Sequence, residues 1–189
     1  MKLTKRLILA SRSPRRVTLL NQIGLNAEVI PAEVSEELDV QLSPTENART
    51  LAIRKAEHVA RRIERAIVVG ADTIVAIDGQ MLGKPVDRGD AIRMLNMLSG
   101  RTHVVHTGFA LVGRPSNQKI SGVESTSVTF RTLPLDEIEE YVHGGSPIQD
   151  DYGAVFVRRI EGCFYNVVGF PLSRFYESLQ RFQEQLTES

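Results

Sequence analysis

The chain has 189 residues, of which 42% are hydrophobic and 24% charged, a composition typical of a globular protein built as one domain or two small lobes that share a core. Its 23 basic and 23 acidic residues balance, which excludes a global electrostatic field that would recruit nucleic acid or a membrane surface. The single cysteine excludes an internal disulfide and fits a reducing cytoplasm, and no run approaches the roughly 18 apolar residues that a membrane span needs.

The first predicted elements are a strand at residues 7–10 and a helix that ends at Gly24, joined by Ser11-Arg12-Ser13-Pro14-Arg15-Arg16. Ser13 is suited to cap this helix and Pro14 to its first turn. Backbone N–H groups, the positive end of the helix dipole and three arginines then gather at one place, which favours an oxyanion such as phosphate. A solvated basic helix start is the alternative interpretation.

The next segments alternate between strand and helix patterns. An acidic loop with Glu33, Glu36 and Glu37 follows a second strand at 27–31, and a capping box at Ser43 opens a long helix to about Arg65. We predict further strands at 66–77, 80–83, 102–112, 123–132, 155–160 and 164–168, the first two joined by an Asp78-Gly79 type I′ turn and the last two forming a hairpin, with helices at 90–98, 134–142 and from about 171.

These elements predict an α/β fold in which a mixed sheet is flanked by helices, since the alternation favours parallel pairs and the hairpins require antiparallel ones. No linker divides the chain, so we expect one domain over residues 1–189. The glycine-rich dinucleotide-binding and P-loop patterns are both absent from the sequence, so neither of those nucleotide sites is supported.

Three charged residues stand in unexpected places. Asp72 interrupts the apolar run 67–75, where an ionised carboxylate needs a partner, and Lys55 lies on the apolar stripe of its helix. Lys84 ends a predicted strand against Pro85. Asp72 is interpreted as a metal ligand or general base, or as a hydrogen-bonded structural residue at a bulge after Gly70. A snorkelling side chain is the alternative interpretation of Lys55, and a plain surface lysine that of Lys84.

The acidic loop has a solvated and a functional interpretation. One of its glutamates, paired with Asp72, would supply the two carboxylates that hold Mg²⁺. The four histidines show no metal-ligand spacing, and His103 and His106, three apart in a strand, should face opposite sides of the sheet. Ser11 has no visible histidine–acid partners, so a serine hydrolase is weakly supported.

Together these residues resemble the Maf-like nucleoside triphosphate pyrophosphatases, in the right order and over nearly the whole chain. The matching segments are Leu9-Ala10-Ser11-Arg12-Ser13-Pro14-Arg15-Arg16, the acidic loop through Glu36, Leu51-Ala52 with Lys55-Ala56, Gly70-Ala71-Asp72-Thr73, Gly83-Lys84-Pro85, Leu98-Ser99-Gly100-Arg101-Thr102-His103, and Val167-Val168-Gly169-Phe170-Pro171-Leu172. The resemblance implies an elongated α/β fold with a cleft between two lobes, similar to inosine triphosphate pyrophosphatases. It also implies metal-dependent hydrolysis of a nucleoside triphosphate to the monophosphate and pyrophosphate.

Within that family the chain looks like the branch that acts on dTTP and UTP, because Arg15, Thr73 and Gln149 match its selectivity positions. One departure concerns the segment before the Ile148-Gln149 pair, where family members carry a stretch similar to Asp-Lys-Ala-Gly-Ala-Tyr-Gly and this chain has Pro147 directly. Either that loop is deleted, which would put activity in doubt, or the sequence omits it, which is the interpretation we favour.

The resemblance and the charged residues together give each candidate a role. Ser11, Arg15, Arg16, Lys55 and Lys84 would bind the triphosphate. Glu36 and Asp72 would hold Mg²⁺ or Mn²⁺, and Asp72 is also a candidate proton acceptor; the sequence does not separate these two roles. Thr73 and Gln149 would face the pyrimidine.

The expected substrate is a pyrimidine nucleoside triphosphate, modified ones included, and we expect a cytoplasmic enzyme without stable nucleic-acid or membrane partners; a homodimer stays open. Two other classes of function remain. One is a nucleotide-binding regulator of septum formation or cell division, and the other is a phosphatase acting on sugar or nucleoside monophosphates.

Overall fold

A computed structural model describes residues 3, 5–144 and 151–187. Its centre is a seven-stranded sheet in the order β2-β1-β3-β5-β6-β7. The seventh strand, β4, pairs with residues 75–77 of β3, beyond the part of β3 that pairs with β1. β1 is parallel to β2 and β3, and the other pairs are antiparallel, so the predicted mixed sheet is confirmed. The strands are β1 (Leu7–Leu9), β2 (Glu28–Val29), β3 (Ala66–Ile77), β4 (Gln80–Leu82), β5 (Thr102–Arg114), β6 (Lys119–Phe130) and β7 (Val157–Glu161).

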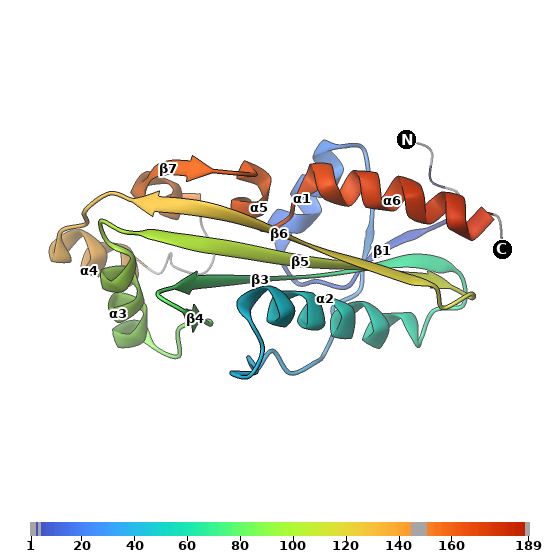
Figure 1. The fold of residues 1–189 in the computed structure, drawn as a ribbon, viewed down its shortest axis with the longest axis horizontal. Coiled ribbons are helices and arrows are strands. Elements are labelled where there is room, and N and C mark those ends of the chain that lie inside the picture. The colour runs from blue at the N-terminus through green and yellow to red at the C-terminus, as the bar shows by residue number, and fades with distance from the viewer. Residues whose placement is uncertain (1–2, 4, 145–150, 188–189) are drawn as a thin grey trace.

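The molecule is elongated along the long strands β3, β5 and β6 (Figure 1). α2 covers one face of the sheet and α1 and α6 cover the other, while α3 and α4 lie together at the end opposite the two termini (Figure 1). The helices are α1 (Pro14–Gln22), α2 (Pro44–Ala60), α3 (Arg88–Leu98), α4 (Leu135–His143), α5 (Phe164–Val168) and α6 (Leu172–Thr187). Within the described residues, none of these helices has the length and apolar character to cross a membrane.

Alternation along the central strands divides the core into two layers. Ile67, Val69 and Ala71 of β3 face α1 and α6, whereas Ala66 and Val68 face α2. The same period of two assigns the residues that follow: position 72 points to the α2 face and position 73 to the opposite face. Adjacent residues at the centre of β3 therefore present their side chains to different environments.

Two glycines let α2 lie directly against the sheet. A Cβ built on Gly70 would stand 2.1 Å from the carbonyl oxygen of Ala52, and one built on Gly108 would stand 2.2 Å from that of Ala48. Both contacts are with helix backbone, which cannot move aside as a flexible side chain can. Since alanines occupy the facing positions of α2, helix and strands approach closely and fix the height of the rest of this helix above β3.

We expect Gly108→Ala to lower the free energy of unfolding by about 3 kcal/mol, because the added methyl group forces α2 away from the sheet. Gly83→Ala is the matched control, since a Cβ there meets nothing within 4 Å. Urea unfolding followed by circular dichroism measures both. Equal stability of the two variants would contradict the close packing.

One predicted hairpin is wrong. Residues 164–168 form the short helix α5 rather than a strand, and residues 151–156 form a 3-10 helix before β7. The side chain of Asn166 explains the difference: it is fully buried, and its Nδ2 donates to the carbonyl oxygen of Val105 at 2.9 Å and to Oγ1 of Thr126 at 2.9 Å. These bonds hold α5 against β5 and β6, where a second hairpin strand would have no such anchor.

Local turn and cap predictions are largely confirmed. Asp78 and Gly79 both have positive φ, as a type I′ turn requires, and Ser43 and Glu46 form the capping box of α2. That helix ends at Ala60, five residues before the predicted end. Ser13 stands at the N-cap of α1 but makes no side-chain cap hydrogen bond, so its predicted capping role is wrong.

His103 is a buried histidine of β5. Its ring meets that of Phe130 edge-on with 4.8 Å between the ring centroids, and no described residue makes a hydrogen bond to its Nδ1. Burial lowers the pKa of His103 to about 4 from the ordinary 6.5. The imidazole is therefore neutral in the folded protein at physiological pH and belongs to the core, whereas the sequence left a structural and a surface position open.

Folding stability should fall as the pH drops from about 6.5 to about 4, because in that window the unfolded chain binds a proton that folded His103 does not. We expect His103→Phe, which keeps an aromatic contact with Phe130, to flatten this part of the profile. The exposed His143 is the control, and His143→Gln should leave the slope intact. Urea unfolding between pH 4 and 7.5 provides the test, and parallel profiles for wild type and His103→Phe would refute it.

Candidate functional site

The candidate site lies on an edge of β3 that is only partly covered. β1 pairs with β3 at residues 67–69 and β4 pairs with it at 75–77 on the same side, so among the described strands none pairs with residues 70–74 there. The loop that follows β1 leads into α1 on one face of the sheet, and the loop that follows β2 leads into α2 on the other. Polar and charged side chains from distant parts of the sequence therefore converge on the middle of β3.

Four of these side chains form what we call the carboxylate–lysine cluster: Glu36, Lys55, Asp72 and Lys84. The ammonium of Lys55 lies 2.5 Å from Oδ1 of Asp72 and 2.6 Å from Oε1 of Glu36. The ammonium of Lys84 lies 2.5 Å from Oε2 of Glu36. Glu36 of the acidic loop thus contacts both lysines, and Lys55 in turn contacts Asp72.

Burial differs sharply within the cluster. The Lys55 and Asp72 side chains are only 8% and 13% exposed, whereas Glu36 is 38% and Lys84 81% exposed. Lys55 reaches this position because the glycine contacts seat α2 against β3. Buried charges need close partners of opposite charge, and Lys55 and Asp72 lie beside each other. The pair Lys55–Asp72 therefore forms the buried part of the cluster, and Lys84 forms its solvent-facing part.

The lysines control the ionisation of Glu36. Partial burial raises its pKa, but hydrogen bonds and charge from Lys55 and Lys84 outweigh that effect and hold the pKa at about 2 instead of 4.5. Glu36 is accordingly a carboxylate at physiological pH. Two anions balance two cations, so the cluster is electrically neutral until a ligand arrives.

The donor set fits a hard divalent cation. Oxygens of Glu36 and Asp72 both lie within hydrogen-bond distance of one ammonium, so they are close enough to converge on a single ion. Mg²⁺ binds through one or two carboxylates and completes its shell with water and substrate phosphate. Among the described residues there is no group of three or more metal-ligating side chains.

Arg16 lies on the face of β3 that points away from α2, opposite the carboxylate–lysine cluster, and is buried. Its Nε donates to the carbonyl oxygen of Gly169 at 3.0 Å, its Nη1 to Oγ of Ser11 at 3.1 Å and to the carbonyl oxygen of Ala71 at 2.8 Å, and its Nη2 to Oγ1 of Thr73 at 3.0 Å. Burial lowers the pKa of Arg16, and the charge of Asp72 acts in the opposite direction. Arg16 therefore links α1, β3 and the segment after α5.

Those contacts refine two sequence-based predictions. Ser11 is also buried, and its Oγ accepts from the backbone N–H of Ser13 as well as from Arg16. Binding of phosphate by Ser11 and Arg16 stays a prediction, and here most of the Arg16 donors already hold protein oxygens. Arg15, by contrast, is exposed in the first turn of α1.

Sequence reasoning missed a polar network behind Thr73. Its hydroxyl bonds to that of Thr107 at 2.9 Å, and Thr107 donates to the carbonyl oxygen of Asn166 at 3.2 Å. Thr107 and Asn166 are fully buried. A threonine and an asparagine inside predicted strands gave the only signal, and that signal does not distinguish them from ordinary strand residues. Gln149 lies outside the described residues.

We expect Lys55→Met to lower the free energy of unfolding by about 2 kcal/mol, because it leaves the buried Asp72 carboxylate without its ammonium partner. Lys84→Met is the matched control: it loses a partner of the same Glu36, but its exposed pair is worth at most about 1 kcal/mol. Urea unfolding at pH 7 measures both. Equal losses of unfolding free energy in the two variants would contradict the division of the cluster into a buried and an exposed part.

Comparison with known proteins gives consistent matches over almost the full length. The family model described as Maf-like protein matches residues 6–182. A dTTP/UTP pyrophosphatase of Carboxydothermus hydrogenoformans is 44% identical over 94% of this chain and 98% of its own, and one of Bacillus pumilus is 43% identical over 93% and 96%. Protein VC0702 from Vibrio cholerae, a solved structure, has a TM-score of 0.37 and 15% identity over 77% of this chain and 81% of that one, too slight a likeness to use further.

Proposed function

Since the chain belongs to the Maf-like protein family, we propose that it is a nucleoside triphosphate pyrophosphatase that converts dTTP and UTP, modified pyrimidine triphosphates included, to the monophosphate and pyrophosphate. Relatives that carry the name dTTP/UTP pyrophosphatase support this substrate choice. The observation that carries the proposal is the carboxylate–lysine cluster, which joins loop, helix and strand at the uncovered edge of β3.

The cations of the site bind the triphosphate. Lys84 is exposed and moves most easily from Glu36 to a phosphate oxygen. Arg15 is exposed at the start of α1, on the opposite face of the sheet from α2. Lys55 stays buried and supplies a fixed positive charge. Such neutralisation and positioning are the main requirements of phosphoryl-group chemistry, because the transition state spreads negative charge over the phosphate oxygens.

The carboxylates serve the attacking water. A water oxygen bonds to the α-phosphorus, the bond from that phosphorus to the α–β bridging oxygen breaks, and pyrophosphate leaves. Asp72 accepts the proton that the water loses; if Asp72 instead held the metal, that proton would pass to solvent. Glu36 and Asp72 would hold Mg²⁺ or Mn²⁺, which when bound lowers the pKa of water and neutralises phosphate charge.

Pyrimidine selection involves Arg15, Thr73 and Gln149. Thr73 points away from the α2 face, and its hydroxyl is fixed between Arg16 and Thr107. With those two bonds made, the hydroxyl has one lone pair left, which can accept a hydrogen bond from a ring N–H. We further propose that the protein works in the cytoplasm, in line with its single cysteine.

Product analysis tests the reaction. The purified chain is incubated with each nucleoside triphosphate and Mg²⁺ or Mn²⁺, and the products are separated. We expect monophosphate and pyrophosphate, fastest from dTTP and UTP. Release of orthophosphate, preference for a purine triphosphate, or tight binding without hydrolysis would overturn the proposal, the last in favour of a nucleotide-binding regulator.

Asp72→Asn tests the central carboxylate. We expect a loss of at least about 10²-fold in kcat, the usual scale for removing a general base, with the fold retained. Glu64→Gln removes an exposed carboxylate beyond α2 and should leave the rate unchanged. Circular dichroism and urea unfolding check that Asp72→Asn is folded. Full activity in that variant would remove Asp72 from the mechanism.

A further inference from the structure

The side chain of Asn47, near the start of α2, is only 2% exposed. Its Nδ2 donates to the carbonyl oxygens of Asp39 at 2.8 Å and of Leu42 at 3.1 Å, and its Oδ1 accepts from the backbone N–H of Asp39 at 2.8 Å. The two ends of one amide thus hold both polar backbone groups of a single loop residue. Because rotation about one of these bonds would break the other, the contact fixes the orientation of the loop as well as its distance from the helix.

Helix capping does not explain these bonds. The free groups at a helix N-terminus are N–H donors, and the capping box of Ser43 and Glu46 already serves this end of α2. Asn47 donates instead to carbonyl oxygens that precede the helix. Asparagine is a weaker helix former than alanine, and a buried amide requires hydrogen-bond partners. The Asn47 side chain therefore serves the loop rather than the helix.

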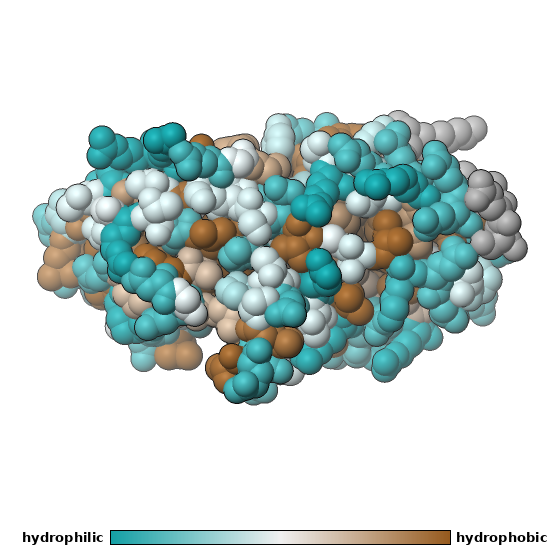
Figure 2. Space-filling view, in the orientation of Figure 1, coloured by the Kyte–Doolittle hydropathy of each residue, from teal (hydrophilic) through white to brown (hydrophobic). Residues whose placement is uncertain are grey.

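The loop that Asn47 holds is the acidic loop that carries Glu36. It projects from the body of the molecule just before α2 (Figure 1, Figure 2). Between Ile30 and Asp39, the described backbone makes one hydrogen bond, and that bond lies within the loop. Asp39 is therefore the next point after Ile30 at which this backbone is bonded to the rest of the described chain. Glu36 lies only three residues before that point.

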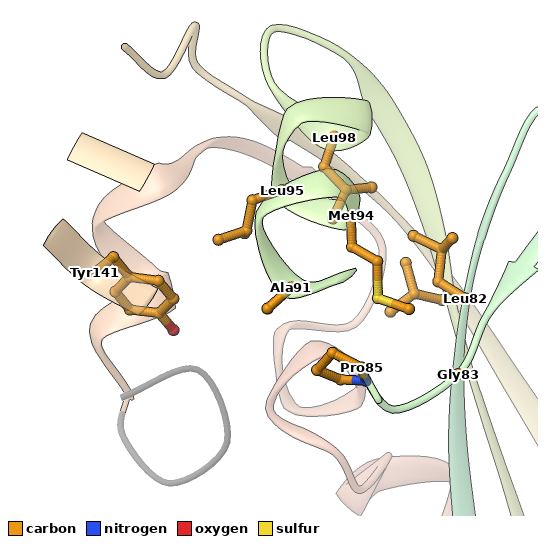
Figure 3. A pocket seen from close by; sticks show the side chains of 9 residues that line it. Leu82, Gly83, Pro85, Ala91, Met94, Leu95, Leu98 and Tyr141 are labelled. Carbon is orange, nitrogen blue, oxygen red and sulfur yellow. The ribbon is translucent and has the colours of Figure 1, made fainter. Parts of the chain in front are cut away.

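The backbones that carry the two lysine partners of Glu36 are held without this loop. Leu82 packs in a hydrophobic cluster with α3, and Figure 3 shows Leu82 and Pro85, on either side of Lys84 in the chain, beside that helix. Lys55 belongs to α2, which lies directly against the sheet. Placement of the glutamate between the two lysines therefore depends on where the loop is anchored.

We propose that Asn47 is a positioning residue for Glu36: its amide fixes the acidic loop where this carboxylate reaches both lysines. The inference rests on the proposed function, in which Glu36 would hold the metal ion, and extends it to a residue outside the carboxylate–lysine cluster. Asn47 also contacts Sδ of Met81 in β4 at 3.3 Å, three residues before Lys84. One buried amide thus touches both the loop that carries the glutamate and the strand that leads to its exposed partner.

Asn47→Ala removes the amide and leaves a good helix former in α2. We expect the affinity for Mn²⁺ to fall about tenfold or more, the usual scale when a residue that orients a metal ligand is lost. Asn47→Leu, whose side chain is closer in size to asparagine, should behave alike and replaces the alanine variant if that one does not fold. Ser43→Ala is the matched control, because it weakens the same end of α2 but keeps the Asn47 bonds, and its Mn²⁺ affinity should stay that of the wild type.

Two measurements on full-length protein, shown by circular dichroism to be folded, test the proposal. Electron paramagnetic resonance of free Mn²⁺ gives the metal affinity without nucleotide or turnover. Hydrogen exchange followed by mass spectrometry gives the protection of residues 36–42 without metal. Weaker Mn²⁺ binding and faster exchange in Asn47→Ala, but not in Ser43→Ala, support the positioning role. Unchanged Mn²⁺ affinity in Asn47→Ala, or an equal loss in both variants, overturns it.

Failure of the proposed function has a different signature. In that case the wild-type protein releases no pyrophosphate from UTP at saturating Mn²⁺, whereas Asn47→Ala and Ser43→Ala still differ in Mn²⁺ affinity and in exchange of the loop. Failure of the positioning role alone leaves pyrophosphate release by the wild type intact and removes that difference between the variants.

Discussion

The close approach of α2 to the sheet is the constraint on which the rest of the site depends. Gly70 and Gly108 remove the two Cβ atoms that would hold the helix away, and small residues of α2 face them. Only at that height does the Lys55 ammonium reach the carboxylate of Asp72 on the strand beneath. Packing and chemistry are thus coupled: the glycines that bring helix and strand together also set the geometry of a buried ion pair.

That ion pair has a cost that the surrounding residues offset. A lysine that is 8% exposed gives up much of its hydration, and it regains electrostatic stabilisation from two carboxylates instead of one. Glu36 in turn is held ionised by two lysines. In the proposed function, an incoming triphosphate would meet a site that is already charged, ordered and neutral overall, and Lys84 would move from Glu36 to phosphate with little rearrangement. Preorganisation of this kind is what the proposed reaction needs.

The sequence predicted the elements of the site better than their arrangement. Asp72, Lys55 and Lys84 were recognisable because each charge stands in an apolar or strand-end position, and the mixed sheet follows from alternating elements and hairpin turns. The role of Arg16 was less accessible, since its partners Gly169, Ala71 and Thr73 come from distant segments and two of the contacts are with backbone carbonyls. α5 was mistaken for a strand because the buried hydrogen bonds of Asn166, rather than local propensity, decide its conformation.

The two faces of β3 divide the proposed work. Asp72 and the cluster serve the phosphates, whereas Thr73 serves the pyrimidine, and the alternation of the strand makes both available at adjacent positions. The most direct measurement is a crystal structure of the protein with Mn²⁺ and a non-hydrolysable dUTP analogue, using the anomalous signal of the metal. The account predicts one Mn²⁺ bonded to oxygens of Glu36 and Asp72, with the triphosphate beside Lys55 and Lys84. A metal and triphosphate bound away from these four residues would contradict it.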